Sequence, residues 1–131
     1  MTKHPLTEYV NRLAALMGLS NWHITIRSGA PDTADAWAET KVWERALRGD
    51  IVLNVDKRPD DRPHLREILV HELLHLHLAD LDHAAQGVET VLGQSVYTVF
   101  YDRHSVDEEK TVQQIARFWA PKLPLPPPVK E

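Results

Sequence analysis

The segment LVHELLHLHLAD, residues 69–80, most constrains what this chain can fold into, because titratable side chains interrupt a run of leucines there. Aliphatic residues recur on nearly every side of residues 63–79, a pattern that predicts a buried α-helix. Such a helix encloses His71, Glu72 and His75 in apolar surroundings. Burying an ionisable group without a partner is costly, so these three side chains require one.

The spacing of these three residues indicates a metal ion as that partner. On a helix, His71 and His75 lie one turn apart on the same face, where two imidazoles can bind one zinc ion at roughly 2.0–2.1 Å. Glu72 lies on the adjacent face, beside the place of a water molecule at the metal, which it can deprotonate. This H-E-x-x-H arrangement predicts a Zn²⁺ site with Glu72 as the catalytic base. The alternative is a pair of ordinary core histidines bonded to the backbone or to carboxylates.

The rest of the chain predicts one small α+β domain, residues 1–120. Apolar residues at helical spacing or in strict alternation give these elements: a helix at 5–17, strands at 21–28, 36–44 and 47–55, the buried helix at 63–79, an ambiguous segment at 84–102 that we interpret as helix, and a last helix at 105–119. Residues 121–131 form a Pro-rich tail that we expect to be extended and partly disordered.

Several local signals indicate where these elements begin and end. Gly49 and Asp50 indicate a kink or turn, and Gly93 interrupts the ambiguous segment. Ser105, with a glutamate three residues later, resembles a capping box and predicts a new helix there. Asp60 or Asp61 is placed to cap the buried helix, with proline in its first turn.

Composition excludes some functions. The 131 residues are 43% hydrophobic, which supports one core, and they include no cysteine that could form a disulfide or a thiolate metal site. The net charge of −4 gives no reason to expect nucleic-acid or membrane binding. The N-terminus does not have the pattern of a signal peptide, and no apolar run is long enough to span a bilayer. We therefore expect a cytoplasmic protein.

A third metal ligand is required, because catalytic zinc usually takes three protein ligands and water. His83 follows His75 by eight residues, whereas metzincins and similar triple-His bacterial endoribonucleases place the third histidine six residues on, where this chain has Leu81. We therefore expect His83 to be a surface or helix-end residue. His77 points away from the ligand face, and His64 lies two turns back.

A carboxylate from the last helix is the other option. Asp107, Glu108 and Glu109 stand at its start, and both glutamates flank the inward face that is marked by Val112 and Ala116. Periodicity slightly favours Glu108 and does not choose between the two. A favourable interaction with the helix dipole explains acidic residues in a first turn without any metal.

The chain resembles the small HExxH zinc metallopeptidases of the gluzincin type. The likeness is greatest to short phage- and prophage-associated metallopeptidases, and it extends distantly to ImmA/IrrE-type proteins. It runs from WHITI to Trp119 and includes LVHELLHLHLA and an EE-x-x-V-x-x-(I/L)-A helix. It implies a zincin-like fold in a bacterial or phage-encoded protein. Gluzincins take their third ligand from a glutamate on such a helix, often with a supporting polar residue four positions on. Because Gln113 stands there, the resemblance favours Glu109 over Glu108, although the helix departs from the full Asn-Glu-x-x-x-Asp signature.

The resemblance implies zinc-dependent hydrolysis of a peptide or protein substrate. Oxyanion donors are usual in such sites, and Tyr97, Tyr101 and His104 are the candidates. An edge strand near residues 36–43 or 47–55 could bind an extended peptide by strand addition. Two other classes stay open: a metal-dependent hydrolase of a non-peptide substrate such as RNA, and a non-catalytic, metal-stabilised interaction module with a regulatory role.

Overall fold

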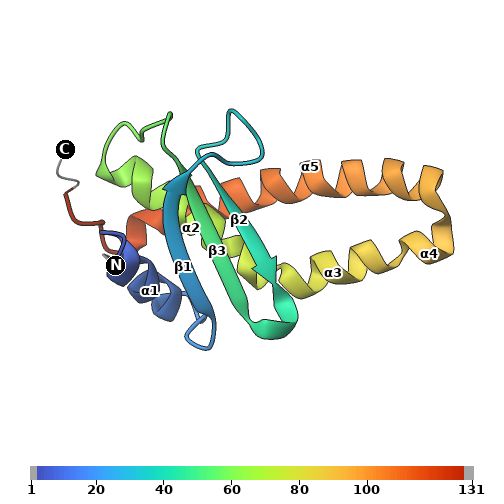
Figure 1. Cartoon of the computed structure of the whole chain (residues 1–131), viewed down its shortest axis with the longest axis horizontal. Helices are drawn as coiled ribbons and strands as arrows, with labels where there is room; N and C mark the ends of the chain where they lie inside the picture. The colour runs from blue at the N-terminus through green and yellow to red at the C-terminus, as the bar shows by residue number, and fades with distance from the viewer. Residues whose placement is uncertain (1–2, 129–131) are drawn as a thin grey trace.

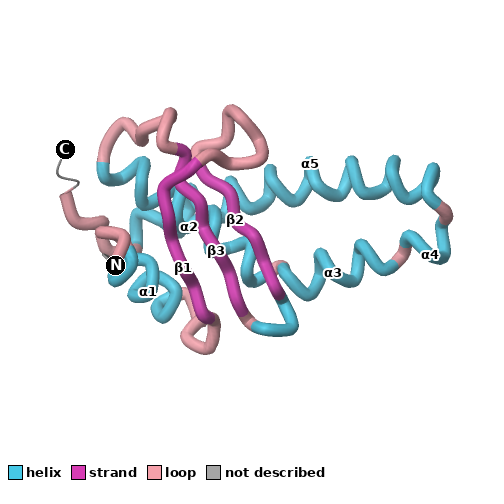
Figure 2. Tube along the Cα trace, in the orientation of Figure 1, coloured by secondary structure: helices cyan, strands magenta, loops and turns pink. Residues whose placement is uncertain are grey.

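A small mixed β-sheet lies against a layer of helices in the computed structural model, which describes residues 3–128 (Figure 1). In chain order the elements are α1 (Thr7–Leu16), β1 (His23–Gly29), β2 (Ala38–Trp43), η1 (Glu44–Ala46), β3 (Arg48–Asn54), α2 (Arg62–His77), α3 (Ala79–Gly87), α4 (Glu89–Leu92), α5 (Gln94–Trp119) and η2 (Ala120–Lys122). Figure 2 shows the same elements by type. The predicted α+β class is confirmed.

The sheet has the order β1-β3-β2, with β1 parallel and β2 antiparallel to β3. The alternation that predicts β1 is observed, since Ile24 and Ile26 are buried while Thr25 between them is exposed. These isoleucines pack with residues of α1 and α2 in one hydrophobic core. The sheet therefore buries the face on which α1 and α2 lie.

The turn between β2 and β3 lies earlier than the sequence predicts. The chain reverses through η1, and Leu47 adopts the left-handed conformation with φ 49°. Gly49 instead lies within β3, paired with Ile24 and Val42, so the prediction of a turn at Gly49 and Asp50 is wrong. Glycine at this position allows Leu76 of α2 to pack against β3, because a Cβ atom there would lie 2.8 Å from the Leu76 Cδ2 atom.

Helix α2 is the centre of the molecule, as its apolar pattern predicts. Asp61 caps it by accepting a 2.8 Å hydrogen bond from the backbone N–H of His64, and Pro63 lies in the first turn. Leu69 and Leu73 are fully buried in the core. The prediction of a capped, buried helix is confirmed.

The two C-terminal helices that the sequence predicts are divided differently in the structure. The chain breaks at Gly93, where φ is 79°, and α5 then runs unbroken to Trp119. Ser105 lies inside α5, so the predicted capping box and the predicted helix start there are wrong. No glycine or proline occurs between residues 94 and 119 to end the helix, so a serine in its interior has no free helix end to cap. Helices α3 and α4 and the first half of α5 form a hairpin that projects beyond the sheet (Figure 1).

The Pro-rich segment after η2 lies along α1 and α2. The Tyr9 hydroxyl donates to the carbonyl of Pro124 at 2.7 Å, and Arg62 Nε donates to the carbonyl of Pro126 at 2.7 Å. Pro126 is fully buried. The part of the predicted tail at residues 129–131 lies outside the described residues. No helix within residues 3–128 is long and apolar enough to cross a membrane.

Candidate metal centre

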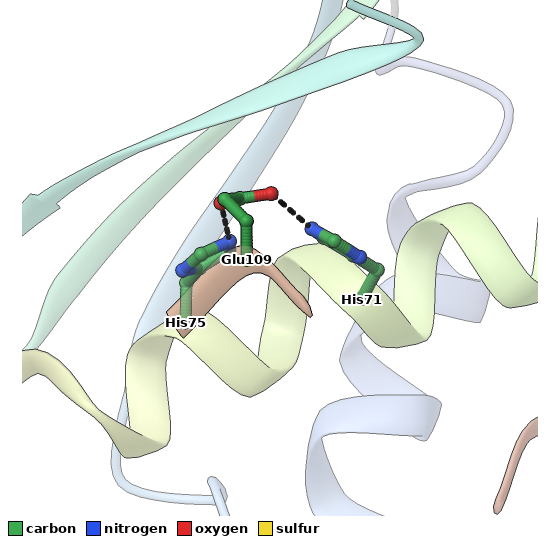
Figure 3. Close-up of side chains that lie close together, drawn as sticks. All are labelled: His71, His75 and Glu109. Carbon is green, nitrogen blue, oxygen red and sulfur yellow. Dashed lines mark hydrogen bonds and ion pairs between the residues drawn. The ribbon is translucent and has the colours of Figure 1, made fainter. Parts of the chain in front are cut away.

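The structure brings His71 and His75 of α2 against Glu109 of α5 (Figure 3). One carboxylate oxygen of Glu109 lies 3.1 Å from His71 Nε2, and the other lies 2.8 Å from His75 Nε2. One potential ligand atom from each residue lies within 4.8 Å of the others. Helix α5 is held at this register because Val112 and Ala116 are fully buried, and Ala116 belongs to the core that includes α2.

The second nitrogen of each imidazole has its own partner. His71 Nδ1 lies 2.7 Å from Gln113 Oε1, and the Gln113 amide donates to Glu67 at 3.1 Å. His75 Nδ1 lies 3.2 Å from Glu108 Oε1. Each Nδ1 can therefore donate its proton to these oxygens, which directs both Nε2 lone pairs toward Glu109. Such second partners fix the tautomer and ring orientation of metal-binding histidines.

Glu108 and Glu109 thus occupy two different places in the site. Glu109 faces the imidazole Nε2 atoms, while Glu108 lies behind the ring of His75 and also contacts His104 Nε2 at 3.2 Å. His104 in turn lies 3.1 Å from Asp82. Periodicity could not separate these places, because both glutamates flank the same face of α5. The sequence did not predict that Glu67 and Asp82 support the site through Gln113 and His104, because nothing in their local sequence indicates it.

Glu72 is buried beside the two histidines, with 7% of its surface exposed. Its Oε1 accepts a 2.8 Å hydrogen bond from the Thr40 hydroxyl of β2, and its Oε2 lies 4.0 Å from His71 Nε2. Burial raises the pKa of Glu72, against the opposing effects of both histidines and Thr40. The sequence did not predict the contact of Thr40 with Glu72, because only the packing of β2 on α2 makes the two residues neighbours.

The acidic neighbours also determine the charge of the histidines. Burial by itself lowers the pKa of His75, but the hydrogen bond to Glu109 and the charges of Glu72, Glu109 and Glu108 raise it to about 9. The pKa of His71 is raised for similar reasons, and hydrogen bonds from both rings hold the pKa of Glu109 well below its usual range. In the ion-free protein, the negative charge of Glu109 therefore favours protons on both imidazoles.

These residues fit a zinc ion by the chemistry of their donor atoms. Two imidazole nitrogens and one carboxylate are ligands that Zn²⁺ prefers, and catalytic sites commonly combine two histidines with one glutamate. The Nε2 atoms of His71 and His75 converge on the same carboxylate, so an ion could replace the protons that they share with Glu109. His71, His75 and Glu109 are therefore the residues that could hold the metal.

A neighbouring set of side chains shares His75 with these ligands. His75, Asp82 and Glu108 also bring potential ligand atoms within 4.8 Å of one another. Burial, followed by the hydrogen bond and charge of Asp82, raises the pKa of Glu108 to about 7. His104 Nε2 lies 3.1 Å from Asp82 and 3.2 Å from Glu108, so an imidazole already bridges the two carboxyl groups of this set.

Three other histidines contact groups outside the candidate metal centre. His77 Nε2 contacts the backbone carbonyl of Met17 at 2.7 Å, and His83 contacts Glu44 at 2.9 Å. His64 Nδ1 accepts from the backbone N–H of Asp60 at 3.0 Å. The structure therefore does not bring any of these three histidines to the ligand cluster, in agreement with the interpretation of the sequence.

Two cavities adjoin the site along strand β2. They have volumes of about 360 Å³ and 490 Å³, and both are lined by Ala36, Ala38, Glu72 and Glu109. Strand β2 is an edge of the sheet, whereas β3 is hydrogen-bonded on both sides. Of the two predicted edge segments, residues 36–43 therefore provide a free edge, and the prediction for residues 47–55 is wrong.

The predicted oxyanion donors do not line either cavity. Tyr97 and Tyr101 stack on each other within the hairpin, with ring centroids 5.5 Å apart. The Tyr101 hydroxyl accepts from the Gln86 amide at 3.3 Å. His104 is held by Asp82 and Glu108 behind the ring of His75. None of the three is therefore placed to contact a substrate carbonyl beside Glu72.

Comparison with known proteins does not assign the chain to a family. No family model matches the chain, and no curated protein or solved structure matches it. The function is therefore inferred from the geometry of the site.

Proposed function

We propose that this protein is a zinc-dependent hydrolase of peptide bonds. The observation that carries the proposal is the convergence of His71 and His75 on Glu109, with Glu72 buried beside them. Two histidines and a carboxylate leave a further position for substrate or water in a four-coordinate zinc site. The zincin-like fold inferred from the sequence is part of the same proposal.

Glu72 is the residue that moves the proton. A zinc ion held by the three ligands would polarise the substrate carbonyl and lower the pKa of water beside it. Glu72 accepts the proton of the attacking water and then delivers it to the leaving amine. The Thr40 hydroxyl, 2.8 Å from Glu72 Oε1, fixes the orientation of the carboxylate. Because burial raises the pKa of Glu72, its affinity for the proton is higher than that of an ordinary surface glutamate.

The edge of β2 is the place for the substrate backbone. Both cavities run beside residues 36 and 38, so an extended peptide that pairs with β2 would lie next to Glu72. The larger cavity adds Glu39 and Asp82 to the acidic lining. Such a lining repels a polyanion, so it supports a peptide over RNA as the substrate.

The test is the cleavage of a peptide library at neutral pH by zinc-loaded protein and by Glu72→Gln. Glutamine has nearly the same shape but cannot accept the proton, so zinc should stay bound while the rate falls by roughly 10²–10⁴-fold. Glu89→Gln, which makes the same change at an exposed position in the hairpin, is the matched control and should cleave at the parental rate.

Each contrary result has a defined meaning. If Glu72→Gln cleaves as fast as the parent, Glu72 is not the base. If the parent cleaves RNA and not peptides, the protein is a metal-dependent hydrolase of another polymer. If zinc is bound and neither polymer is cleaved, the site is a structural clamp in a non-catalytic module.

A further inference from the structure

The projecting hairpin carries large apolar side chains that the other described residues leave partly or largely exposed. We name as the hairpin patch the exposed residues Val91, Leu92, Val96, Val99, Phe100 and Val106. Their exposed fractions range from 40% for Leu92 and Phe100 to 83% for Val91. These side chains give the segment the apolar periodicity of a buried helix, yet within one chain they remain in solvent.

The inside of the hairpin is filled by other residues. Tyr101 of α5 binds Gln86 of α3, and His104 of α5 binds Asp82 of α3. Polar and aromatic side chains therefore join the two arms, while valines lie outside. An isolated helical hairpin normally buries its apolar residues between its helices and exposes its polar ones. The reversed arrangement indicates a second buried surface outside the single chain.

The outer face of α5 has the spacing of a helix-pairing seam. Val96, Val99, Arg103 and Val106 follow one another at intervals of three, four and three residues. This is the 3-4 spacing by which two helices pack along a shared seam. The arginine at one position can lay its aliphatic stem along the seam and place its guanidinium at the rim.

The size of the hairpin patch suits a protein interface. At roughly 100–200 Å² for each fully exposed side chain, it presents on the order of 500 Å² of apolar surface. The largest apolar patch on a typical monomer covers about 300–600 Å², and such patches are often functional. Because about 57–65% of an interface is apolar, the patch corresponds to roughly 800 Å² on each partner, the size of a standard stable interface.

We propose that the hairpin patch binds the same patch of a second copy of this chain, forming a two-fold symmetric bundle of two hairpins. Beside the seam, Arg103 pairs with Asp107 of the same helix at 3.0 Å, and the exposed Asp102 and Lys110 carry opposite charges that suit a self-complementary contact. In a two-fold dimer, Asp102 of one copy can face a basic side chain of the other copy. This inference does not depend on the proposed hydrolytic activity.

The experiment is to measure molecular mass by sedimentation at increasing protein concentration, for the parent and for Val99→Glu. The parent should form a dimer, and Val99→Glu should weaken self-association by on the order of 100-fold or more, because dimerisation would have to remove the new carboxylate from water among the valines of the seam. Val55→Glu is the matched control, since Val55 is 54% exposed after β3, outside the hairpin. It should dimerise like the parent.

A charge pair provides the decisive positive result. Val99→Glu and Val99→Lys should each be monomeric, and mixing the two should restore a dimer. Hydrogen exchange of the parent gives a second readout that needs no variant: protection of residues 94–106 should rise with protein concentration, while that of β1 should not. A parent that stays monomeric, a dimer that Val99→Glu leaves intact, or exchange in 94–106 that is independent of concentration would overturn the proposal.

Discussion

Replacing Glu109 should weaken zinc binding far more than replacing its neighbour Glu108. Glu109 contacts the Nε2 atoms of both His71 and His75, at 3.1 and 2.8 Å, whereas Glu108 contacts one of these two histidines, His75, through its Nδ1 atom at 3.2 Å. Structural zinc sites gain roughly 10–16 kcal/mol from four ligands, or about 3 kcal/mol for each ligand. The loss of Glu109 as a ligand should therefore raise the Kd for zinc by roughly 10²–10³-fold.

Glutamine is the sharpest substitution at both positions, because it keeps the shape of glutamate. In Glu108→Gln the amide oxygen can still accept from His75 Nδ1, so the Kd should rise by less than about 10-fold. Glu108→Ala removes that acceptor and should cost roughly 10–100-fold, as is typical for the second partner of a metal-binding histidine. Asp107→Asn changes the exposed preceding carboxylate and should have no effect.

Competition with a chromophoric zinc chelator measures the dissociation constants of the parent and of the four variants under the same conditions. Circular dichroism of the ion-free variants verifies that each helix is intact. If Glu108→Gln raises the Kd more than Glu109→Gln does, the third ligand is Glu108. The assignment of Glu109 as the third ligand, which rests on the distances between α2 and α5, would then be wrong.

Three further predictions concern stability and protons. Zinc at 100 times its Kd should raise the free energy of unfolding by about 2.7 kcal/mol, and identical melting curves with zinc and with a chelator would contradict this. The raised pKa values of His71 and of His75, about 9 for the latter, mean that protons compete with zinc at pH 7. Binding should release roughly one to two protons per ion in calorimetry with different buffers, and affinity should fall as pH falls; two unshifted imidazoles would release only about half a proton. Gly49→Ala should cost about 1–3 kcal/mol in urea denaturation, because its Cβ would lie 2.8 Å from Leu76 Cδ2, whereas Gly87→Ala meets no atom within 4 Å and should not destabilise. Equal stability of the two alanine variants would show that Leu76 moves aside freely.

The sequence by itself determined the local features of this protein. The aliphatic run around residues 63–79 requires a buried helix, and an aspartate followed by proline begins it. Alternation in β1 gives one buried face. The one-turn spacing of His71 and His75 is a consequence of helix geometry alone, so their shared face and the adjacent place of Glu72 could be derived without any tertiary contact.

Only the tertiary structure decided which distant groups meet these residues. Glu108 and Glu109 are one residue apart, and the packing of α5 on α2 alone places Glu109 at the Nε2 atoms and Glu108 behind His75. The Thr40 hydroxyl reaches Glu72 because β2 lies at the sheet edge over α2. The unbroken α5 also overrides the local capping signal at Ser105, since a cap acts only where a helix end is free. Local spacing fixes the direction of a side chain on its own helix, whereas its partner depends on the register between elements, which long-range packing sets.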